Sequence, residues 1–152
     1  MTRILVTGAT GNIGRLTLDH LLKRRPAGDL VGLARDPARA SDLTSKGIDI
    51  RQGDYFDQAG LLRAFDGVEK VMLVSATAFT DQRTQHDNVI DAARHAGVKH
   101  IVYMPIIHKA GSGSSLPQVT EEDLRVEEKL KASRLTYTLV RHPPFLENIE
   151  LY

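Results

Sequence analysis

Thr7-Gly8-Ala9-Thr10-Gly11-Asn12-Ile13-Gly14 lies between a short apolar run, residues 3–6, and a stretch in which Leu18, Leu21 and Leu22 recur at helical spacing. A GxxGxxG pattern alone is weak evidence, but at a strand-to-helix turn it is typical of dinucleotide binding. Glycines permit a tight turn and a close ligand, and the free N–H groups of a helix start attract a diphosphate. The alternative interpretation is a glycine-rich connection that binds no ligand.

Short apolar runs alternate with longer stretches of helical periodicity along the whole chain. This order predicts a single α/β domain of the Rossmann type, a three-layer doubly wound fold with a parallel sheet between helices. The expected strand order is 3-2-1-4-5-6. The expected strands are residues 3–6, 30–34, 49–51, 70–74, 100–104 and 135–140, and the expected helices are residues 13–24, 37–45, 58–65, 81–95 and 121–132.

Capping signals mark several helix ends. Asp36 precedes Pro37 at one expected helix start, and Asp57 precedes the third helix. Thr120 and Asp123 have the spacing of a capping box, which predicts that the last helix begins after Thr120 and that Asp123 serves mainly to cap it. Two glycines suited to left-handed helix caps follow expected helices, Gly47 and Gly97.

Composition excludes several classes of protein. The 152 residues are 41% hydrophobic and 26% charged, as expected of one globular domain. With 20 Lys and Arg against 19 Asp and Glu, the formal charge of +1 gives no electrostatic reason to expect nucleic acid or an anionic membrane as partner. The absence of cysteine excludes disulfides, a thiolate nucleophile and a Cys-based zinc site. No signal peptide or spanning segment is apparent, so a cytoplasmic protein is expected.

The residues after the second expected strand bear on the choice of dinucleotide. An acid roughly 20 residues after the glycines would bind both ribose hydroxyls and indicate NAD. This chain has Arg35 there, 21 residues after Gly14, and Asp36 is better explained as a cap. Arg39 falls in the first turn of the next helix, where a cation is unfavourable unless an anion is bound nearby. Arg35 and Arg39 therefore favour NADP(H) over NAD(H), the alternative being two solvated surface arginines.

Several stretches together resemble the NmrA-like, atypical short-chain dehydrogenase/reductase family, and within it the NADPH:quinone oxidoreductase type 2 branch. The likeness covers essentially all 152 residues, in order and with similar spacing. The stretches that carry it are residues 7–14, 32–37, 52–54, 93–102, 137–141 and 147–148.

The resemblance implies NADP(H) bound along the carboxyl edge of the sheet, and hydride transfer to a quinone-like acceptor. Arg35 would bind the 2′-phosphate and Asp54 would lie near adenine. The residues it implies for the pyrophosphate are Gly8, Thr10, Gly11, Asn12 and Ile13. Those implied beneath the ribose and diphosphate are Ser75, Ala76 and Thr77. Those implied beside the nicotinamide are Tyr103, Met104, Pro105 and the segment 143–145.

The chain also departs from the family pattern. The Tyr-x-x-x-Lys pair is absent, because Ile107 stands four places after Tyr103 and Arg141 four places after Tyr137. Relatives usually continue past residues 147–148 into a smaller region that covers the substrate, so residues 1–152 are expected to lack it. A quinone suits a site without this pair, since the cofactor supplies the hydride and a single hydrogen-bond donor or water can protonate the reduced oxygen.

Four residues remain as candidate catalytic groups, each with a structural alternative. Tyr103 is a candidate because the resemblance implies that it lies beside the nicotinamide. Glu127 shares a helical face with Leu130 and is equally explained as part of an amphipathic helix. His108 and His142 follow strands near the expected nicotinamide site, but loop histidines more often have surface roles. The remaining histidines are given no role and no metal is expected, because no acids stand near them as ligands; they are His20, His86, His95 and His100.

Two functions from different classes follow. The first is an NADPH-dependent oxidoreductase acting on a quinone-like small molecule. The second is a non-catalytic NADP(H)-sensing protein of the NmrA type, whose partner would be a regulatory protein. A methyltransferase-type domain is disfavoured because Arg35 replaces the acid that its cofactor's ribose needs. A homodimer is a further expectation.

Overall fold

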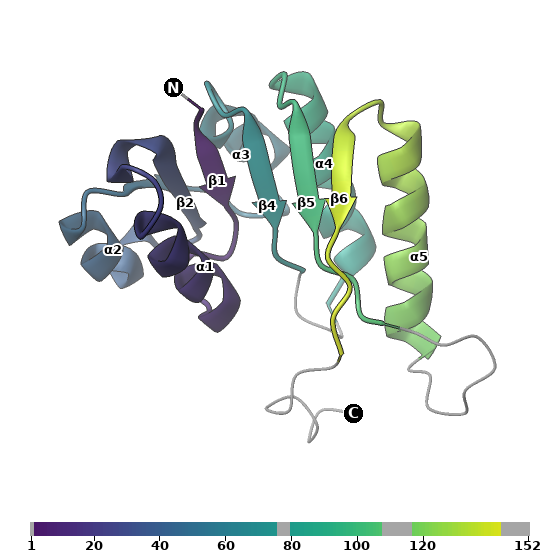
Figure 1. Ribbon diagram of the computed structural model, residues 1–152. Helices are drawn as coiled ribbons and strands as arrows, with labels where there is room; N and C mark the ends of the chain where they lie inside the picture. The colour runs from purple at the N-terminus through teal and green to yellow at the C-terminus, as the bar shows by residue number, and fades with distance from the viewer. Residues whose placement is uncertain (1, 76–79, 108–116, 144–152) are drawn as a thin grey trace.

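The computed structural model describes residues 2–75, 80–107 and 117–143, and its centre is one parallel sheet (Figure 1). The strands are β1 (Ile4–Val6), β2 (Leu30–Ala34), β3 (Asp49–Gln52), β4 (Lys70–Leu73), β5 (His100–Tyr103) and β6 (Thr136–Leu139). Their order is β3-β2-β1-β4-β5-β6, which confirms the predicted topology. The winding reverses between β1 and β4, and ligands of such sheets bind at the carboxyl ends of the strands beside this point.

Helices cover both faces of the sheet and complete the three layers. The α-helices are α1 (Asn12–Leu22), α2 (Ser41–Ser45), α3 (Gln58–Ala64), α4 (Gln82–His95) and α5 (Pro117–Ala132), and the 3-10 helices are η1 (Ala27–Asp29) and η2 (Pro37–Ala40). One apolar cluster packs α1 and α2 against one face of the sheet, at β1 and β2, through Leu18 and Leu43. The larger cluster joins α3, α4 and α5 to the opposite face. None of the described helices is long and apolar enough to cross a membrane.

Most element boundaries agree with the sequence prediction to within one or two residues, and the capping signals explain why. Asp36 accepts the N–H of Ala38 at 3.1 Å and Asp57 accepts that of Gly60 at 2.9 Å. Gly47 and Gly97 have left-handed φ angles of +86° and +76°, as expected. The predicted helix 37–45 is divided, because the proline-initiated η2 ends at the buried Ala40 and α2 starts afresh.

The predicted start of the last helix is wrong. Helix α5 begins at Pro117, so Thr120 lies inside it and the expected capping box does not form. Proline suits a first helical position because its missing N–H would have no partner there. Asp123 instead is only 4% exposed and accepts hydrogen bonds from the Tyr103 hydroxyl at 2.6 Å and from the N–H of Ile106 at 2.8 Å. Asp123 therefore joins α5 to the end of β5.

Candidate functional site

The turn between β1 and α1 leaves the first N–H groups of the helix available. Gly11 is the residue before the helix, and its N–H binds the carbonyl oxygen of Gly8 at 2.9 Å. Within the described residues, no side chain caps α1, and its first turn carries no acid. Uncapped N–H groups at the positive end of a helix dipole favour an anion. The turn therefore forms a cradle of backbone donors of the kind that favours an anion.

Two glycines are required by the shape of this cradle. Gly8 has φ +63°, a left-handed conformation that side chains disfavour. A Cβ atom built on Gly14 would overlap the carbonyl oxygen of Gly8 and come within 2.9 Å of that of Thr7. The missing side chain of Gly14 therefore lets α1 pack closely on the turn that follows β1. The pattern GxxGxxG thus follows from backbone geometry at its first and last positions.

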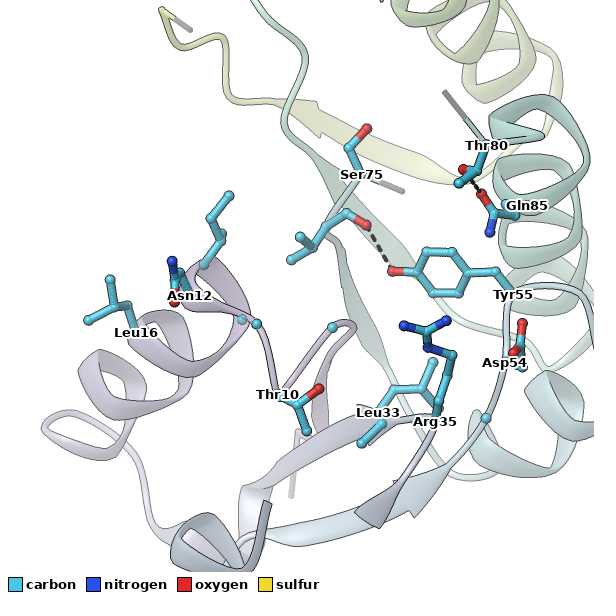
Figure 2. Close-up of a pocket in the computed structure, with 17 residues that line it drawn as sticks. Thr10, Asn12, Leu16, Leu33, Arg35, Asp54, Tyr55, Ser75, Thr80 and Gln85 are labelled. Carbon is cyan, nitrogen blue, oxygen red and sulfur yellow. Dashed lines mark hydrogen bonds between the residues drawn. The ribbon is translucent and has the colours of Figure 1, made fainter. Parts of the chain in front are cut away.

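A cavity of about 450 Å³ opens over this turn, at the carboxyl ends of β1, β2 and β4 (Figure 2). Eight residues that the sequence singled out for the cofactor line it: Gly8, Thr10, Gly11, Asn12, Ile13, Arg35, Asp54 and Ser75. Three others, Arg39, Met104 and Pro105, are not among its lining residues. Ala76 and Thr77 lie outside the described residues. Its size suits a nucleotide-like ligand more than a single ion.

Arg35 brings positive charge into the cavity. It follows β2 directly, and in Figure 2 its side chain points toward the ring of Tyr55. The carbonyl oxygen of Arg35 accepts the side-chain amide of Gln52 at 3.3 Å, which ties it to the end of β3. Arg39 lies on η2 with an exposed side chain, and its carbonyl oxygen accepts Arg15 at 3.2 Å. Of the two arginines expected to act together, Arg35 lines the cavity and Arg39 is not among the lining residues.

Tyr55 is a residue of the cavity wall that the sequence analysis missed. Its hydroxyl lies 2.6 Å from Oγ1 of Thr7 and 2.8 Å from the carbonyl oxygen of Val74. Oγ1 of Thr7 also accepts the N–H of Val74 at 2.8 Å. Burial raises the pKa of Tyr55, so the phenol stays neutral and holds these bonds. The available signal was an aromatic residue directly after Asp54, at the carboxyl end of a predicted strand.

A buried polar network lies behind the cavity, between β4, β5, α4 and α5. Oγ of Ser75 lies 3.4 Å from Nε2 of His86 and 3.4 Å from the Tyr103 hydroxyl. Nδ1 of His86 lies 3.0 Å from Oε1 of Glu122. His86 and Tyr103 are fully buried and meet edge to face, with ring centroids 5.8 Å apart. Tyr103, an expected catalytic candidate, is not among the described residues that line the cavity, and it contacts the lining residue Ser75.

The two other candidate catalytic groups within the described residues, Glu127 and His142, are not among the residues that line the cavity. Glu127 is buried, and both its oxygens accept Nη2 of Arg141, at 2.7 and 2.8 Å. His142 bonds with its backbone N–H to the carbonyl oxygen of Pro105 at 3.1 Å, which holds the segments after β5 and β6 together. His108 lies outside the described residues. Within the described part of the chain, no three His, Asp or Glu side chains are grouped as metal ligands.

The family model described as NAD(P)H-binding matches residues 8–150. Over 145 residues the chain is 41% identical to quinone oxidoreductase 2 of Escherichia coli strain K12, a match that covers 95% of this chain and 50% of that protein. Over 154 residues it is 32% identical to the NmrA-like family domain-containing oxidoreductase flvB of Aspergillus flavus, covering 99% of this chain and 50% of that one. The chain therefore spans about half the length of these curated relatives.

Solved structures of two oxidoreductases are also similar to this chain. The crystal structure of an NADPH-dependent quinone oxidoreductase from Escherichia coli complexed with NADPH has a TM-score of 0.88 and 39% identity, covering 97% of this chain and 51% of that one. A triphenylmethane reductase from Citrobacter sp. complexed with NADP(H) has a TM-score of 0.87 and 34% identity, covering 95% and 50%. Both similar proteins were crystallised with the phosphorylated dinucleotide.

Proposed function

The chain belongs to the NAD(P)H-binding, NmrA-like family, and from this premise we propose that it is an NADPH-dependent oxidoreductase that transfers hydride to a quinone-like acceptor. The observation that carries the proposal is a single cavity that combines the uncapped start of α1 with the guanidinium of Arg35. A dinucleotide with a 2′-phosphate needs both: backbone N–H groups for the diphosphate and a cation for the additional phosphate.

The residues present fit this cofactor. The N–H groups at the start of α1 would hold the diphosphate, while Gly8 and Gly14 allow the tight turn and the close approach of the helix that present those N–H groups. Arg35, Asp54, Tyr55 and Ser75 line the cavity. Arg35 would bind the 2′-phosphate, Asp54 and Tyr55 would lie at the adenosine end, and Ser75 would lie beside the ribose and diphosphate. When bound, NADPH supplies the hydride, and the protein supplies position and exclusion of water.

The acceptor class is supported by the relatives. Two similar proteins are named for reduction of quinones and of triphenylmethane dyes, and both acceptor types are conjugated molecules that can accept a hydride. Within this proposal, residues 1–152 form the cofactor-binding domain. In the longer relatives, the half that this chain does not match would cover the acceptor. Within this proposal the segments after β5 and β6, which include Met104, Pro105 and His142, face the acceptor. His108, which follows β5 in the sequence, lies outside the described residues. The roles of these residues beside the nicotinamide remain part of the proposal.

Two measurements test the proposal. Calorimetric titration with NADPH is expected to give micromolar or tighter binding, with NADH bound more weakly. Oxidation of NADPH, followed by its absorbance in the presence of a panel of soluble quinones, is expected to give turnover. Binding without any turnover would instead support an NADP(H)-sensing protein whose partner is a regulatory protein. Absence of binding would contradict both functions.

Two finer statements complete the proposal. We place the activity in the cytoplasm, where NADPH is the common reductant.

We also propose a homodimer, because β3 and β6 form the edges of the described sheet and edge strands offer unpaired backbone groups to a second copy. Light scattering at several protein concentrations tests this: a mass of one chain throughout would contradict it.

A further inference from the structure

Gln85, in the first turn of α4, is a half-buried residue of the cavity wall that has not yet been given a role. The hydroxyl of Thr80 donates to Oε1 of its side-chain amide at 2.9 Å. Nε2 makes no hydrogen bond to any of the described residues, and in Figure 2 it lies on the side of the amide toward Tyr55. Because Thr80 occupies the oxygen, Gln85 offers a ligand in the cavity a donor.

Asp54 offers the complementary acceptor in the same cavity wall. Its Oδ1 accepts the N–H of Phe56 at 2.9 Å, and its Oδ2 receives no hydrogen bond from the described residues. Asn88, one turn after Gln85 on α4, donates through Nδ2 to the carbonyl oxygen of Tyr55 at 2.9 Å. This bond ties α4 to the segment that carries Asp54. The donor and the acceptor therefore belong to two elements that are joined directly.

The proposed function brings the base of the cofactor to this wall. With the diphosphate at the start of α1 and the 2′-phosphate on Arg35, the ribose lies between them. The base is attached to the ribose carbon next to the one that carries the 2′-phosphate, whereas the diphosphate is attached on the other side of the ring. The base therefore extends past Arg35 and away from the glycine-rich turn. The lining residues on that side in Figure 2 are Asp54, Tyr55, Thr80 and Gln85.

An adenine in this position turns its far edge toward the wall. That edge, remote from the ribose, carries the 6-amino group, which donates hydrogen bonds, and N1, which accepts one. We infer that Gln85 and Asp54 read this edge together: Nε2 of Gln85 donates to N1, and Oδ2 of Asp54 accepts the 6-amino group. The inference rests on the proposed function and adds Gln85 as a residue that selects adenine among purines.

Hypoxanthine shows why this pair would be selective. It has an oxygen in place of the 6-amino group and a hydrogen on N1. At the same site its oxygen would face the carboxylate of Asp54, and its N1–H would face the N–H of Gln85. Both protein groups would lose their partners, and a site built to hydrogen-bond a ligand rejects analogues that leave its polar groups unpaired.

Titration with two cofactors that differ only in the base tests the pair. NADPH is compared by calorimetry with reduced nicotinamide hypoxanthine dinucleotide phosphate. The unsubstituted chain is expected to bind NADPH at least about tenfold more tightly, the effect of losing one or two hydrogen bonds. This comparison needs no substituted protein. Equal affinities would contradict the inference.

Two variants assign the selectivity to Gln85. Gln85→Leu removes the donor at similar volume, so it is expected to weaken NADPH by about 5- to 10-fold and the hypoxanthine cofactor by less than about twofold. Gln85→Glu replaces the donor by an acceptor that suits N1–H, so the preference for NADPH is expected to fall by about tenfold or more. Both cofactors carry the same phosphates, so the added charge cancels in this ratio.

The matched control is Gln58→Leu, at an exposed glutamine outside the cavity lining, which is expected to leave both affinities unchanged. A role of Gln85 in folding alone would weaken the two cofactors alike. The ratio of the two affinities therefore distinguishes base recognition from loss of structure.

The outcomes separate this inference from the proposed function. If the unsubstituted chain binds neither cofactor, the proposed function fails and this inference fails with it. If the chain binds NADPH but shows no preference over the hypoxanthine cofactor, only the reading of adenine by Gln85 and Asp54 is overturned. The same conclusion follows if each Gln85 variant changes the two affinities by the same factor. A selective loss of NADPH binding in Gln85→Leu, together with a reduced preference in Gln85→Glu, would support the inference.

Discussion

The hydroxyl group of Tyr55 lies 2.6 Å from Oγ1 of Thr7, so a residue that follows β3 is joined to the residue that follows β1. The same hydroxyl lies 2.8 Å from the carbonyl oxygen of Val74, at the end of β4. Three strand ends are thereby held at one point, on the floor of the cavity. The position of the glycine-rich turn relative to Ser75 depends on this junction.

Replacing Tyr55 by Phe is expected to remove the junction without changing the ring. The free energy of unfolding should fall by about 1 kcal/mol, the usual contribution of one hydrogen bond, with some additional loss because buried Thr7 and Val74 atoms lose a partner. NADPH affinity should fall several-fold because the strand ends become less well fixed. Urea denaturation and calorimetric titration provide the measurements. A variant equal to the unsubstituted chain in both would show that the junction is dispensable.

Replacing Gly14 by Ala is expected to push α1 away from β1, because the new Cβ atom would overlap the Gly8 carbonyl oxygen. Overpacking of this kind costs about 1–3 kcal/mol, and the diphosphate cradle would be displaced with the helix. Thermal denaturation and NADPH titration should both show the loss. Gly28→Ala is the control, since no atom lies within 4 Å of a Cβ atom built there. Equal behaviour of the two variants would contradict the close-packing argument.

Glu122 makes the stability of the fold depend on acidity. Its pKa is about 2 in the folded protein, against an ordinary value of 4.5. The charge therefore stabilises the folded state fully above pH 4.5, and the contribution is lost as pH falls toward 2. The full shift corresponds to about 3 kcal/mol, which solvent screening reduces to about 1–2 kcal/mol.

Glu122→Gln should accordingly flatten the acid limb of the stability curve between pH 5 and pH 2.5. Urea unfolding at a series of pH values measures it. Glu128→Gln, whose side chain is 72% exposed, should retain the slope of the unsubstituted chain. An unchanged slope in Glu122→Gln would mean that the carboxylate does not hold its charge through Arg125 and His86.

The sheet order and most elements were predictable from the sequence, because they depend on local signals. Buried parallel strands read as continuous apolar runs such as Leu30–Ala34, and caps such as Asp57 act on residues two or three places away. The roles of Gly8 and Gly14 were predictable for the same reason, because the backbone geometry of the turn alone requires glycine at these positions. The cavity residues in and around the glycine-rich turn could therefore be predicted from the sequence.

The network behind the cavity was not predictable from the sequence, because its partners lie far apart in the chain. Asp123 has local neighbours suited to a capping box, yet Tyr103, 20 residues earlier, determines its role. His86 likewise meets Glu122 across 36 residues and Ser75 across 11. Spacing rules describe contacts along one helix or turn. Contacts between elements arise only when the sheet brings α4 and α5 together.

The central claim is that residues 7–14 bind a diphosphate while Arg35 selects the phosphorylated ribose. Calorimetric titration of NADPH and NADH into the unsubstituted chain, Arg35→Asp and the control Arg63→Gln tests it most directly, since the Arg63 side chain is 74% exposed. Loss of charged hydrogen bonds predicts that Arg35→Asp weakens NADPH by about 10- to 100-fold and NADH by less than about threefold. Equal weakening of both nucleotides, or no binding of either to the unsubstituted chain, would contradict the account.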